Sequence, residues 1–227
     1  PSKPIRIVVA YTPAGTTDIL ARAIGQKLTE AWGQSVIVDN RPGANGNIGT
    51  EYAAKATPDG YTVCVTTPEP LVLNPLLFNR LPYDADSDFA LVTMLAYTFG
   101  VIVAHPSLPA KSVRELIALA KAKPGQFNFS SAGIGSGAHF AAELFKNMAG
   151  VNVVHVPYRG SAPAAFDLIA GQVQCMLTSP LAAVPYANAG KLRLLAVTSK
   201  KRTPAMPDVP AVSETVPGYE SVLWYAF

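Results

Sequence analysis

The sequence predicts an α/β protein made of two consecutive units in which strands and helices alternate. Short β-branched runs, typical of buried strands, alternate with longer segments whose apolar residues recur at helical spacing. This alternation breaks off in the proline-rich stretch 67–88 and starts again after residue 97. Because strands joined by helices usually pair in parallel, we expect mostly parallel sheets wrapped by helices.

Length and composition exclude several classes of protein. The chain has 227 residues, 49% of them hydrophobic, which suffices for one large domain or two lobes with separate cores. No apolar run approaches the roughly 18 residues of a membrane span, and the first residues do not resemble a secretion signal. We therefore expect a cytoplasmic protein or one whose signal has been removed. The net charge is +3 and the basic residues are scattered, which argues against nucleic acid as a partner.

The first unit is predicted to alternate strand, helix, strand, helix and strand. The strands are expected at 5–10, 35–39 and 61–66, and the helices at 16–32 and 48–56. The loop 40–47 is too rich in Gly and Asn for regular structure. The stretch 67–88 contains four prolines, and we expect it to be an irregular surface segment near the edge of the sheet.

The second unit is predicted to continue the alternation as far as residue 198. The strands are expected at 101–104, 127–131, 153–156, 173–177 and 192–198, and the helices at 112–122, 138–149, 161–170 and 181–188. Ser112 and Glu115 have the spacing of a capping box, which defines the start of one helix sharply. The proline-rich tail 200–218 is expected to be a loop, and 221–227 reads as one more strand.

The start of the first helix is a candidate anion-binding loop. Pro13 and Gly15 break the chain after the first strand, and the helix then opens with Thr16, Thr17 and Asp18. A helix start combines free N–H groups with the positive end of the helix dipole, so it can hold a carboxylate or phosphate without a basic side chain. The alternative is that these three polar residues only cap the helix.

The second unit repeats this arrangement in the Ser- and Gly-rich segment 130–137. Ligands of open α/β sheets bind beyond the carboxyl ends of the strands, so two units facing each other would close both loops on one small anion. Gly133, Gly135 and Gly137 do not have the spacing of a dinucleotide-binding loop, and the sequence contains no phosphate-hydrolysing loop motif. A small anion is therefore favoured over a nucleotide.

The sequence offers little for catalysis. None of the three histidines has a catalytic spacing, and no nucleophile elbow, zinc-binding helix or metal-ligand pattern is present. We interpret His105 and His155 as polar residues at strand ends. His139 lies in the first turn of a helix, where it either reaches the ligand or caps its own helix. Cys64 and Cys175 lie in apolar strand-like runs and are predicted to be buried free thiols.

Three other charged residues lie near the Gly-rich turns or among prolines. Arg41 and Arg159 have the chemistry to grip a carboxylate, but we expect each to tie down a loop through backbone carbonyls. Glu69 either recognises an amine in a binding cleft or points into water, and we prefer the second interpretation.

Several short motifs together resemble one protein family. They are Lys3-Pro4-Ile5-Arg6-Ile7-Val8-Val9, Pro13-x-Gly15-x-x-Asp18, Asn40-Arg41-Pro42-Gly43-Ala44, Pro58-Asp59-Gly60-Tyr61, Asn74-Pro75, Pro82-Tyr83-Asp84, Gly135-Ser136 with His139, and Val156-Pro157-Tyr158-Arg159-Gly160. The chain resembles the Bug receptors, the solute-binding proteins of tripartite tricarboxylate transporters, in order from Lys3 to Tyr219. The motifs at 40–44 and 58–61 are the most specific to that family.

The resemblance implies a periplasmic receptor of the two-lobed type II periplasmic-binding-protein fold, known as the Venus flytrap. Such a receptor is no enzyme, needs no cofactor, and captures a small organic acid for a membrane transporter. The implied first lobe covers about residues 1–98, the second 99–220, and 221–227 begins a return crossing to the first lobe. The sequence is expected to be truncated there, which would leave apolar surface on the first lobe, and the full-length protein is expected to be a monomer.

The resemblance also implies that the loops 12–18 and 131–136 hold one carboxylate, with water completing the network. The candidate ligand-binding residues are Tyr11, Thr12, Ala14, Gly15, Thr16, Thr17, Asp18, Glu69, Ser131, Ala132, Gly133, Gly135, Ser136, His139, Thr178 and Ser179. Ala14 stands where the family usually has Gly, Thr178 where many members have Asp, and Glu69 where polar residues are usual. We expect Glu69, Thr178 and Ser179 to set the specificity.

Two alternatives to a transport receptor stay open at this point. One is an α/β enzyme acting on an organic acid, with His139 as general base and Ser131 or Ser136 near the substrate. That mechanism needs a group to orient the base, and none can be located in the sequence. The other is a sensor subunit of the same fold that is recognised by a membrane partner.

Overall fold

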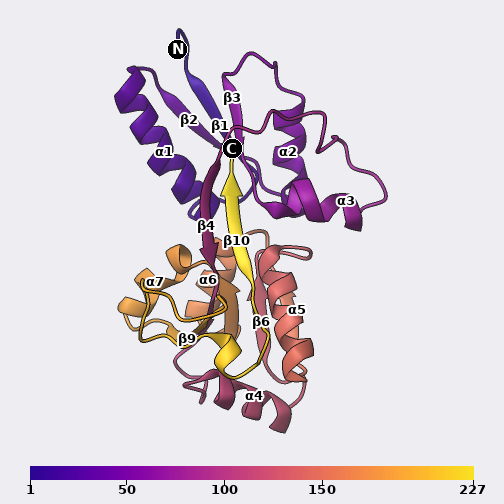
Figure 1. Cartoon of the computed structure of the whole chain (residues 1–227), viewed down its shortest axis with the longest axis vertical. Coiled ribbons are helices and arrows are strands. Elements are labelled where there is room, and N and C mark those ends of the chain that lie inside the picture. The colour runs from indigo at the N-terminus through magenta and orange to yellow at the C-terminus, as the bar shows by residue number, and fades with distance from the viewer. The chain divides into compact units, whose positions relative to one another are not determined.

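The computed structural model describes residues 1–227 and consists of two compact units (Figure 1). Unit 1 comprises Pro1–Tyr97 with Trp224–Phe227, and unit 2 comprises Thr98–Leu223. None of the helices has both the length and the apolar character needed to cross a membrane. The boundaries between the units fall within two paired strands, β4 (Met94–Phe99) and β10 (Val222–Ala226), which form a sheet of their own.

Unit 1 is built on a parallel sheet of three strands in the order β2-β1-β3. These strands are β1 (Ile5–Val9), β2 (Val36–Asn40) and β3 (Thr62–Val65). The β-branched run Ile7, Val8 and Val9 in the central strand is fully buried, because a central strand is covered on both faces. The three strands predicted for this unit and their parallel pairing are confirmed.

Two helices connect these strands. They are α1 (Thr16–Trp32), which packs on β1 and β2, and α2 (Asn47–Ala54), which packs on β1 and β3. Gly25 lets α1 approach the sheet closely, since a Cβ at this position would lie 3.2 Å from the Val36 side chain. The helix ends at Gly33, whose left-handed backbone (φ 66°) lets its N–H donate to the Thr29 carbonyl at 2.9 Å.

The proline-rich stretch of unit 1 has more structure than the sequence predicted. It contains a short π-helical turn, η2 (Glu69–Leu73), followed directly by α3 (Asn74–Leu77). Proline is tolerated in both because each proline lies in the first turn, where no intrahelical N–H bond is lost. The strand β4 was also not predicted, since its residues are exposed or half-buried and do not alternate between apolar and polar.

Unit 2 is built on a five-stranded sheet in the order β7-β6-β8-β5-β9. Its strands are β5 (Val101–Ala104), β6 (Asn128–Ser131), β7 (Val154–Pro157), β8 (Cys175–Thr178) and β9 (Arg193–Val197). β6 pairs in parallel with β7 and β8, whereas β5 is antiparallel to both of its neighbours, β8 and β9. Four of the five strands therefore run in the same direction, and the predicted parallel pairing holds for β6, β7 and β8 but not for the two pairs that the reversed strand β5 forms.

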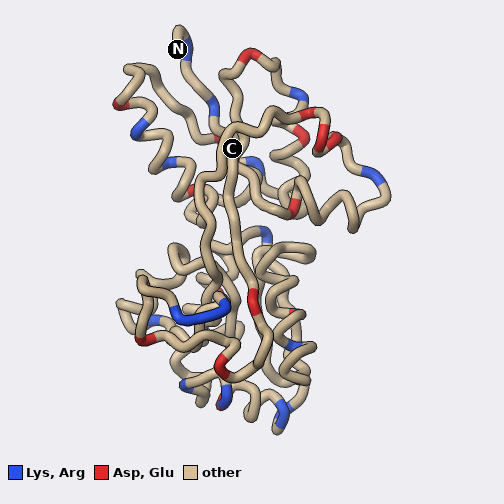
Figure 2. Tube along the Cα trace, viewed as in Figure 1, with Lys and Arg blue, Asp and Glu red and all other residues tan.

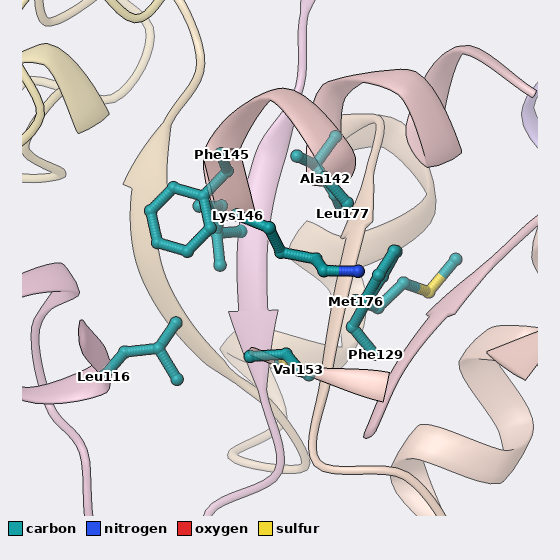
Figure 3. Close-up of a pocket in the computed structure, with 10 residues that line it drawn as sticks. Leu116, Phe129, Ala142, Phe145, Lys146, Val153, Met176 and Leu177 are labelled. Carbon is teal, nitrogen blue, oxygen red and sulfur yellow. The ribbon is translucent and has the colours of Figure 1, made fainter. Parts of the chain in front are cut away.

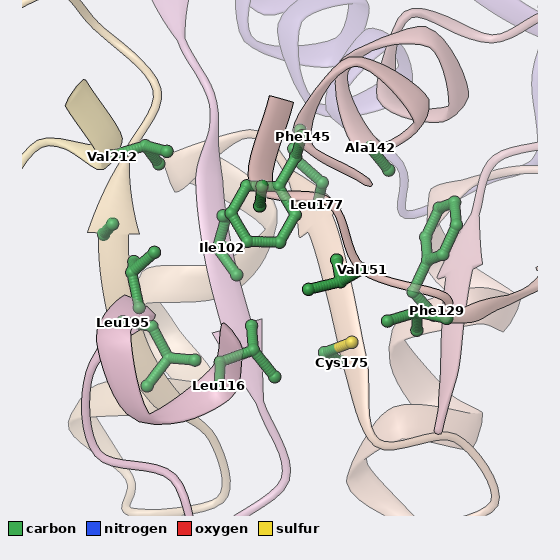
Figure 4. Close-up of a cluster of buried hydrophobic side chains, with 14 of the residues drawn as sticks. Ile102, Leu116, Phe129, Ala142, Phe145, Val151, Cys175, Leu177, Leu195 and Val212 are labelled. Carbon is green, nitrogen blue, oxygen red and sulfur yellow. The ribbon is translucent and has the colours of Figure 1, made fainter. Parts of the chain in front are cut away.

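Four helices cover this sheet: α4 (Val113–Ala122), α5 (Gly137–Ala149), α6 (Ser161–Ile169) and α7 (Pro180–Asn188). The predicted start of α4 at Ser112 is confirmed, but only half of the capping box forms, because the Glu115 side chain binds the N–H of Lys111 instead of that of Ser112. Ser112 accepts the Glu115 N–H at 3.2 Å, and the Glu115 carboxylate accepts the Lys111 N–H at 2.6 Å. One apolar cluster of the unit includes Ile102, Leu116, Phe129, Phe145 and Leu195, contributed by strands and by both α4 and α5 (Figure 4).

Both cysteines are free thiols, as predicted. Cys175 is buried in β8, and Cys64 is half-buried in β3. Burial raises the pKa of each thiol to about 12, which keeps both protonated and unreactive.

Candidate functional site

The first loop, residues 12–18, joins the carboxyl end of β1 to α1. Its left-handed turn is at Ala14 (φ 63°), whereas Gly15 is the N-cap of α1 and has an extended backbone (φ −80°, ψ 170°) that any residue adopts. The position that favours glycine is therefore 14, and this chain places an alanine there. A left-handed conformation costs a residue with a Cβ about 1–2 kcal/mol. The loop must supply interactions that offset this cost.

Asp18 supplies these interactions. Its buried carboxylate accepts the Ala14 N–H at 2.9 Å and the Arg22 Nε–H at 3.0 Å, both through Oδ2. Burial alone would raise the pKa of Asp18, but the hydrogen bonds from Arg22 and Ala14 outweigh it and hold the pKa below its usual value. Asp18 thus ties the start of α1 to the turn at Ala14. This role is additional to the helix capping that the sequence analysis gave as the alternative.

Two polar atoms of the first loop retain unused bonding capacity. Thr12 Oγ1 and Asp18 Oδ1 are both buried and neither has a hydrogen-bond partner. Buried polar atoms in folded proteins are nearly always paired, so unpaired ones mark positions where water or a ligand can bind. The first loop therefore offers a hydroxyl and a carboxylate oxygen in addition to the N–H groups of the helix start.

Tyr11 and Glu69 lie beside the first loop, inside unit 1. The Tyr11 hydroxyl lies 2.7 Å from Thr67 Oγ1 and 3.5 Å from Glu69 Oε2. Burial, followed by the nearby Glu69, raises the pKa of Tyr11 well above its usual value. Glu69 is itself only 7% exposed, so the prediction that it points into water is wrong. The reason is the turn η2, which was not predicted and which places Glu69 inside the unit.

A buried network of polar residues fixes the neighbouring Asn- and Gly-rich segment, and the sequence analysis assigned it no role. Asn74 is fully buried and donates to Asn47 Oδ1 at 2.6 Å, while Asn45 donates to Asn74 Oδ1 at 2.9 Å. The Tyr83 hydroxyl donates to the same Asn47 oxygen at 2.7 Å. The motifs Asn74-Pro75 and Pro82-Tyr83 were visible in the sequence, but residues in a segment expected to be irregular gave no sign of burial.

The second loop, residues 131–136, joins β6 to α5 in unit 2. Gly133 (φ 140°) and Gly135 (φ 79°) both have backbone conformations that favour glycine. A Cβ at Gly133 would also lie 3.1 Å from the Tyr158 carbonyl oxygen. Glycine is thus required at 133 both by the backbone angle and by the close approach of the next strand's end.

Serine side chains fold the second loop onto itself. Gly133 donates its N–H to Ser131 Oγ at 3.1 Å, and the Ser136 hydroxyl donates to the Gly133 carbonyl at 2.7 Å. Ser136 is also the N-cap of α5, where it accepts the His139 N–H at 3.2 Å. Ser131 and Ser136 are both buried. Their structural role is to shape the loop, and the Gly133 N–H, which we expected to face a ligand, is used within it.

Two stacked histidine rings lie against the second loop. His155 Nε2 lies 2.7 Å from Ser131 Oγ, and its ring stacks on His139 with the centroids 4.1 Å apart. His139 Nδ1 accepts the Gly135 N–H at 3.2 Å. Burial lowers the pKa of His139, and burial with the neighbouring His139 lowers that of His155 to about 4. The bond to Ser131 is a role of His155 that the interpretation as a strand-end residue missed.

The contact between Ser131 and His155 has the distance of a nucleophile and its base, but it lacks the other parts of a catalytic site. Ser131 is fully buried, and its oxygen already accepts the Gly133 N–H. The carboxylate nearest this pair, Glu143, lies 3.8 Å from His139 and is not bonded to His155. A base needs a third group to orient it, and this one has none.

Thr178 and Ser179 lie at the same edge of the sheet as Ser131. β6 and β8 are parallel neighbours, with Ser130 opposite Met176, so the carboxyl ends of both strands meet there. Thr178 and Ser179 are buried, and Ser179 caps α7 by accepting the Ala182 N–H at 3.3 Å. The second loop, Thr178 and Ser179 thus lie at one edge of the unit 2 sheet, as expected for candidate residues of a single site.

The candidate residues differ in exposure. In unit 1, Ala14 is exposed and Tyr11 and Thr12 are half-buried, while Gly15, Thr16, Thr17, Asp18 and Glu69 are buried. In unit 2, Ala132, Gly133 and His139 are half-buried, while Ser131, Gly135, Ser136, Thr178 and Ser179 are buried. Most of the candidate side chains are therefore buried, so their contribution to ligand binding has to come mainly from backbone groups.

The arginines do not act as predicted. Arg41 binds the Asp39 carboxylate at 3.0 Å and lies over the Tyr52 ring at 3.5 Å, so a carboxylate and a ring hold it rather than backbone carbonyls. Arg159 is exposed and forms no hydrogen bond or ion pair. The basic residues are scattered along the chain except for one consecutive group, Lys200, Lys201 and Arg202 (Figure 2).

A small cavity under α5 is not suited to an organic acid. It has a volume of about 30 Å³ and is lined by apolar core residues together with the Lys146 side chain, which extends among them (Figure 3). Such a space accommodates water-sized molecules rather than an organic acid. This cavity therefore does not compete with the loops at the carboxyl ends of the strands as the candidate site.

Comparisons with known proteins identify the family of this chain. A family model described as the tripartite tricarboxylate transporter family receptor matches residues 20–227. BugT of Bordetella pertussis (strain Tohama I) is 36% identical over 228 residues, which cover 100% of this chain and 70% of BugT. The chain thus spans about 70% of the length of that relative.

Two solved structures are similar over the whole chain. R. palustris Rpa4515, solved with adipate, is 40% identical with a TM-score of 0.97, and the match covers 100% of this chain and 76% of that one. MatC from Rhodopseudomonas palustris, solved with bound malate, is 30% identical with a TM-score of 0.91, covering 100% and 77%. The fold class implied by the sequence resemblance is confirmed, and these proteins are solute-binding receptors rather than enzymes. The chain belongs to the family of periplasmic solute-binding receptors of tripartite tricarboxylate transporters.

Proposed function

We propose that this receptor captures a small organic acid and binds its carboxylate with the first loop and α1 and with the second loop and α5. The observation that carries the proposal is that two relatives, similar over the whole of this chain, were solved with adipate and with malate. Both are small organic acids. The geometry of each loop supports the same ligand class.

In unit 1, the support comes from the loop's remaining bonding capacity. The N–H groups at the start of α1 lie at the positive end of the helix dipole, and Thr12 Oγ1 is buried without a partner. Arg22 balances the charge of Asp18, so the carboxylate of Asp18 does not make the loop repel an anion. Each hydrogen bond to the ligand carboxylate is expected to contribute about 1.5–3 kcal/mol.

In unit 2, the support comes from the helix start. The N–H groups of Gly133, Gly135 and His139 are used within the second loop and its cap, so the positive end of the α5 dipole is the feature of this unit that favours an anion. Gly133 and Gly135 then act by shaping the backbone that presents this helix start. His139 is half-buried, and we propose that it supports the loop through its hydrogen bond with Gly135 without contacting the ligand.

We further propose that Glu69, Thr178 and Ser179 read the rest of the ligand. Glu69 is buried beside Tyr11, so a ligand group opposite it is favoured if it donates a hydrogen bond and disfavoured if it is a second carboxylate. Thr178 and Ser179 contribute neutral hydroxyls. This division assigns the shared carboxylate to the two loops and selectivity to the three side chains.

The placement of this receptor in a transport system follows from its family. We propose that the full-length protein is a monomer in the periplasm, that a signal peptide has been removed from it, and that it hands its acid to membrane-embedded transporter subunits in transient contacts. Sedimentation of the purified protein with and without its acid tests the monomer. A stable dimer would contradict it.

Native mass spectrometry of the purified protein is the experiment that identifies the ligand class. We expect a bound species with the mass of a small organic acid, which calorimetry then shows to bind in competition with added adipate or malate. A co-purified sugar or cation, together with no heat from any acid in a panel of mono- and dicarboxylates, would contradict the proposal.

Thr178→Asp tests the proposed division of roles. The new carboxylate should weaken binding of dicarboxylates by roughly tenfold or more through like-charge repulsion, while monocarboxylates lose less. The measurement is the rank order of affinities across the panel by calorimetry. An unchanged rank order would remove Thr178 from the specificity residues and leave the carboxylate proposal intact.

A further inference from the structure

We propose that His139 and His155 position the second loop and couple its shape to pH. In this arrangement the neutral His139 ring holds Gly135, and the protonated ring releases it. The proposal deepens the proposed function in one respect, since it treats the second loop as a ligand loop. The observations that carry it are two hydrogen bonds to the loop and the stacking of the two rings.

The hydrogen bond from Gly135 determines which form of His139 holds the loop. The Gly135 N–H donates to His139 Nδ1 at 3.2 Å, so Nδ1 must carry a lone pair. A protonated imidazole donates from both nitrogens and accepts at neither. The neutral ring therefore carries its proton on Nε2, which lies 3.8 Å from the Glu143 carboxylate. Protonation at Nδ1 removes the only acceptor of this N–H that the structure provides.

His155 holds the other end of the loop, and a charge on His139 opposes the charging of His155. It contacts Ser131 Oγ at 2.7 Å, and Ser131 in turn accepts the Gly133 N–H at 3.1 Å. The two imidazole rings are nearly parallel, at 21°, with centroids 4.1 Å apart. Two positive charges at that separation repel each other strongly in a partly buried site. The rings therefore titrate as a coupled pair rather than as two independent groups.

The groups that face the pair come from three elements. Glu143 and Lys146 lie on α5 with His139, Phe129 and Ser131 belong to β6, and His155 belongs to β7. Phe129 stacks on His155 with the ring centroids 4.8 Å apart. The Lys146 Nζ lies over the Phe129 ring, 5.6 Å from its centroid. Glu143 favours the charged form of the rings, whereas Lys146, burial and the apolar Phe129 favour the neutral form.

The sign of the pH effect follows from these surroundings. The pKa of both histidines is lower in the folded protein than the usual value of about 6.5. The unfolded or opened state therefore binds more protons, and the stability that the neutral pair contributes is complete above about pH 6.5. It is lost as the pH falls from there toward about 4, the pKa of His155.

Nuclear magnetic resonance of the ¹⁵N-labelled chain without ligand tests the proposal. We expect the imidazole nitrogen shifts to show a proton on Nε2 of His139 at neutral pH. The exchange protection of the Gly135 amide, corrected for intrinsic exchange, should be constant at neutral pH and fall roughly tenfold as His139 titrates, the effect of losing one hydrogen bond. Protection of Gly135 that follows no histidine titration would overturn the proposal.

Two variants of His139 separate the acceptor from the charge. His139→Phe keeps a ring against His155 but has no acceptor, so Gly135 protection should be low at every pH. His139→Gln keeps an acceptor oxygen that does not titrate, so protection should be retained and independent of pH. Protection in His139→Phe that equals the wild type and keeps its pH dependence would overturn the proposal. If either variant fails to fold, the wild-type titration still decides.

His155→Phe and His105→Gln complete the set. His139→Phe removes the charge that opposes protonation of His155, so His155 should titrate at a higher pH than in the wild type. His155→Phe should leave the His139 titration nearly in place, because His155 is still neutral when His139 titrates. His105 is bonded to Ser107 at 2.7 Å and faces Gly171, so His105→Gln should leave the loop and both titrations unchanged. All of these readouts are made without ligand, so they stand or fall independently of whether an organic acid binds.

Discussion

The first loop and the second loop have the same position in their units but are held by different chemistry. Each joins the carboxyl end of a strand to the start of a helix. In unit 1, a carboxylate and a guanidinium, Asp18 and Arg22, fix a left-handed alanine. In unit 2, two serines and two histidines fix a backbone that only glycine adopts easily. Two loops in equivalent positions are thus held by an ion pair in one unit and by neutral groups in the other.

The largest expected effect tests the backbone requirement of the second loop. Gly133→Val should destabilise the protein by about 2–4 kcal/mol, since it adds a left-handed β-branched residue and a contact with the Tyr158 carbonyl. Gly150→Val is the matched control, because Gly150 also has positive φ (60°) but no atom lies near its Cβ. Urea unfolding of both variants measures the difference. Equal losses would show that the close approach at Gly133 contributes nothing.

The second prediction concerns the ion pair of the first loop. Asp18→Ala leaves the Ala14 N–H without its acceptor and should cost about 2 kcal/mol of unfolding free energy. Asp59→Ala removes an exposed pair with Lys3 in the same unit and should cost much less. Urea unfolding again provides the measurement. A similar cost for both variants would mean that Asp18 does not fix the turn at Ala14.

The third prediction uses pH to distinguish the two loops. Between pH 6.5 and about 4 the second loop should lose protection from hydrogen exchange, because its histidines become charged in the opened state. The first loop should keep its protection over this range, since the pKa of Asp18 is lowered and the carboxylate stays ionised. Exchange mass spectrometry of peptides from each loop measures this. A parallel loss in both loops would argue for global unfolding instead.

The smallest expected effect is at Ala14. Ala14→Gly relieves the left-handed strain of the first loop and should stabilise the protein by up to about 1 kcal/mol. The conformational entropy that glycine adds to the unfolded chain reduces this gain. Ala132→Gly is a suitable control in the second loop, because Ala132 does not have positive φ. Thermal and urea unfolding report the sign. A loss of stability in Ala14→Gly would show that the methyl group makes a packing contact worth more than the strain.

The sequence predicted the elements that carry a local pattern and missed the contacts between distant segments. β-Branched runs located β1 and β5, and the Ser112 capping box located the start of α4. Strand β4 escaped detection because its half-exposed residues lack a pattern, and η2 was hidden by prolines. Pattern reasoning is strongest where one face is uniformly apolar, and these segments have no such face.

The candidate site shows the same division. Both loops were located from a strand followed by Gly and a polar helix start, which is a local signal. The pairing of Ser131 with His155 joins residues 24 positions apart, and that of Tyr11 with Glu69 joins residues 58 positions apart. No spacing rule links such residues, so the burial of Glu69 and the roles of the two histidines emerged only from the fold.

The central claim is that backbone groups of the two helix starts bind the carboxylate of an organic acid. A crystal structure of the protein with its co-purified acid tests this most directly. The account predicts carboxylate oxygens within about 3 Å of N–H groups at the start of α1 and of α5, with no arginine or lysine in contact. A carboxylate held by a basic side chain, or an acid bound away from both loops, would contradict it.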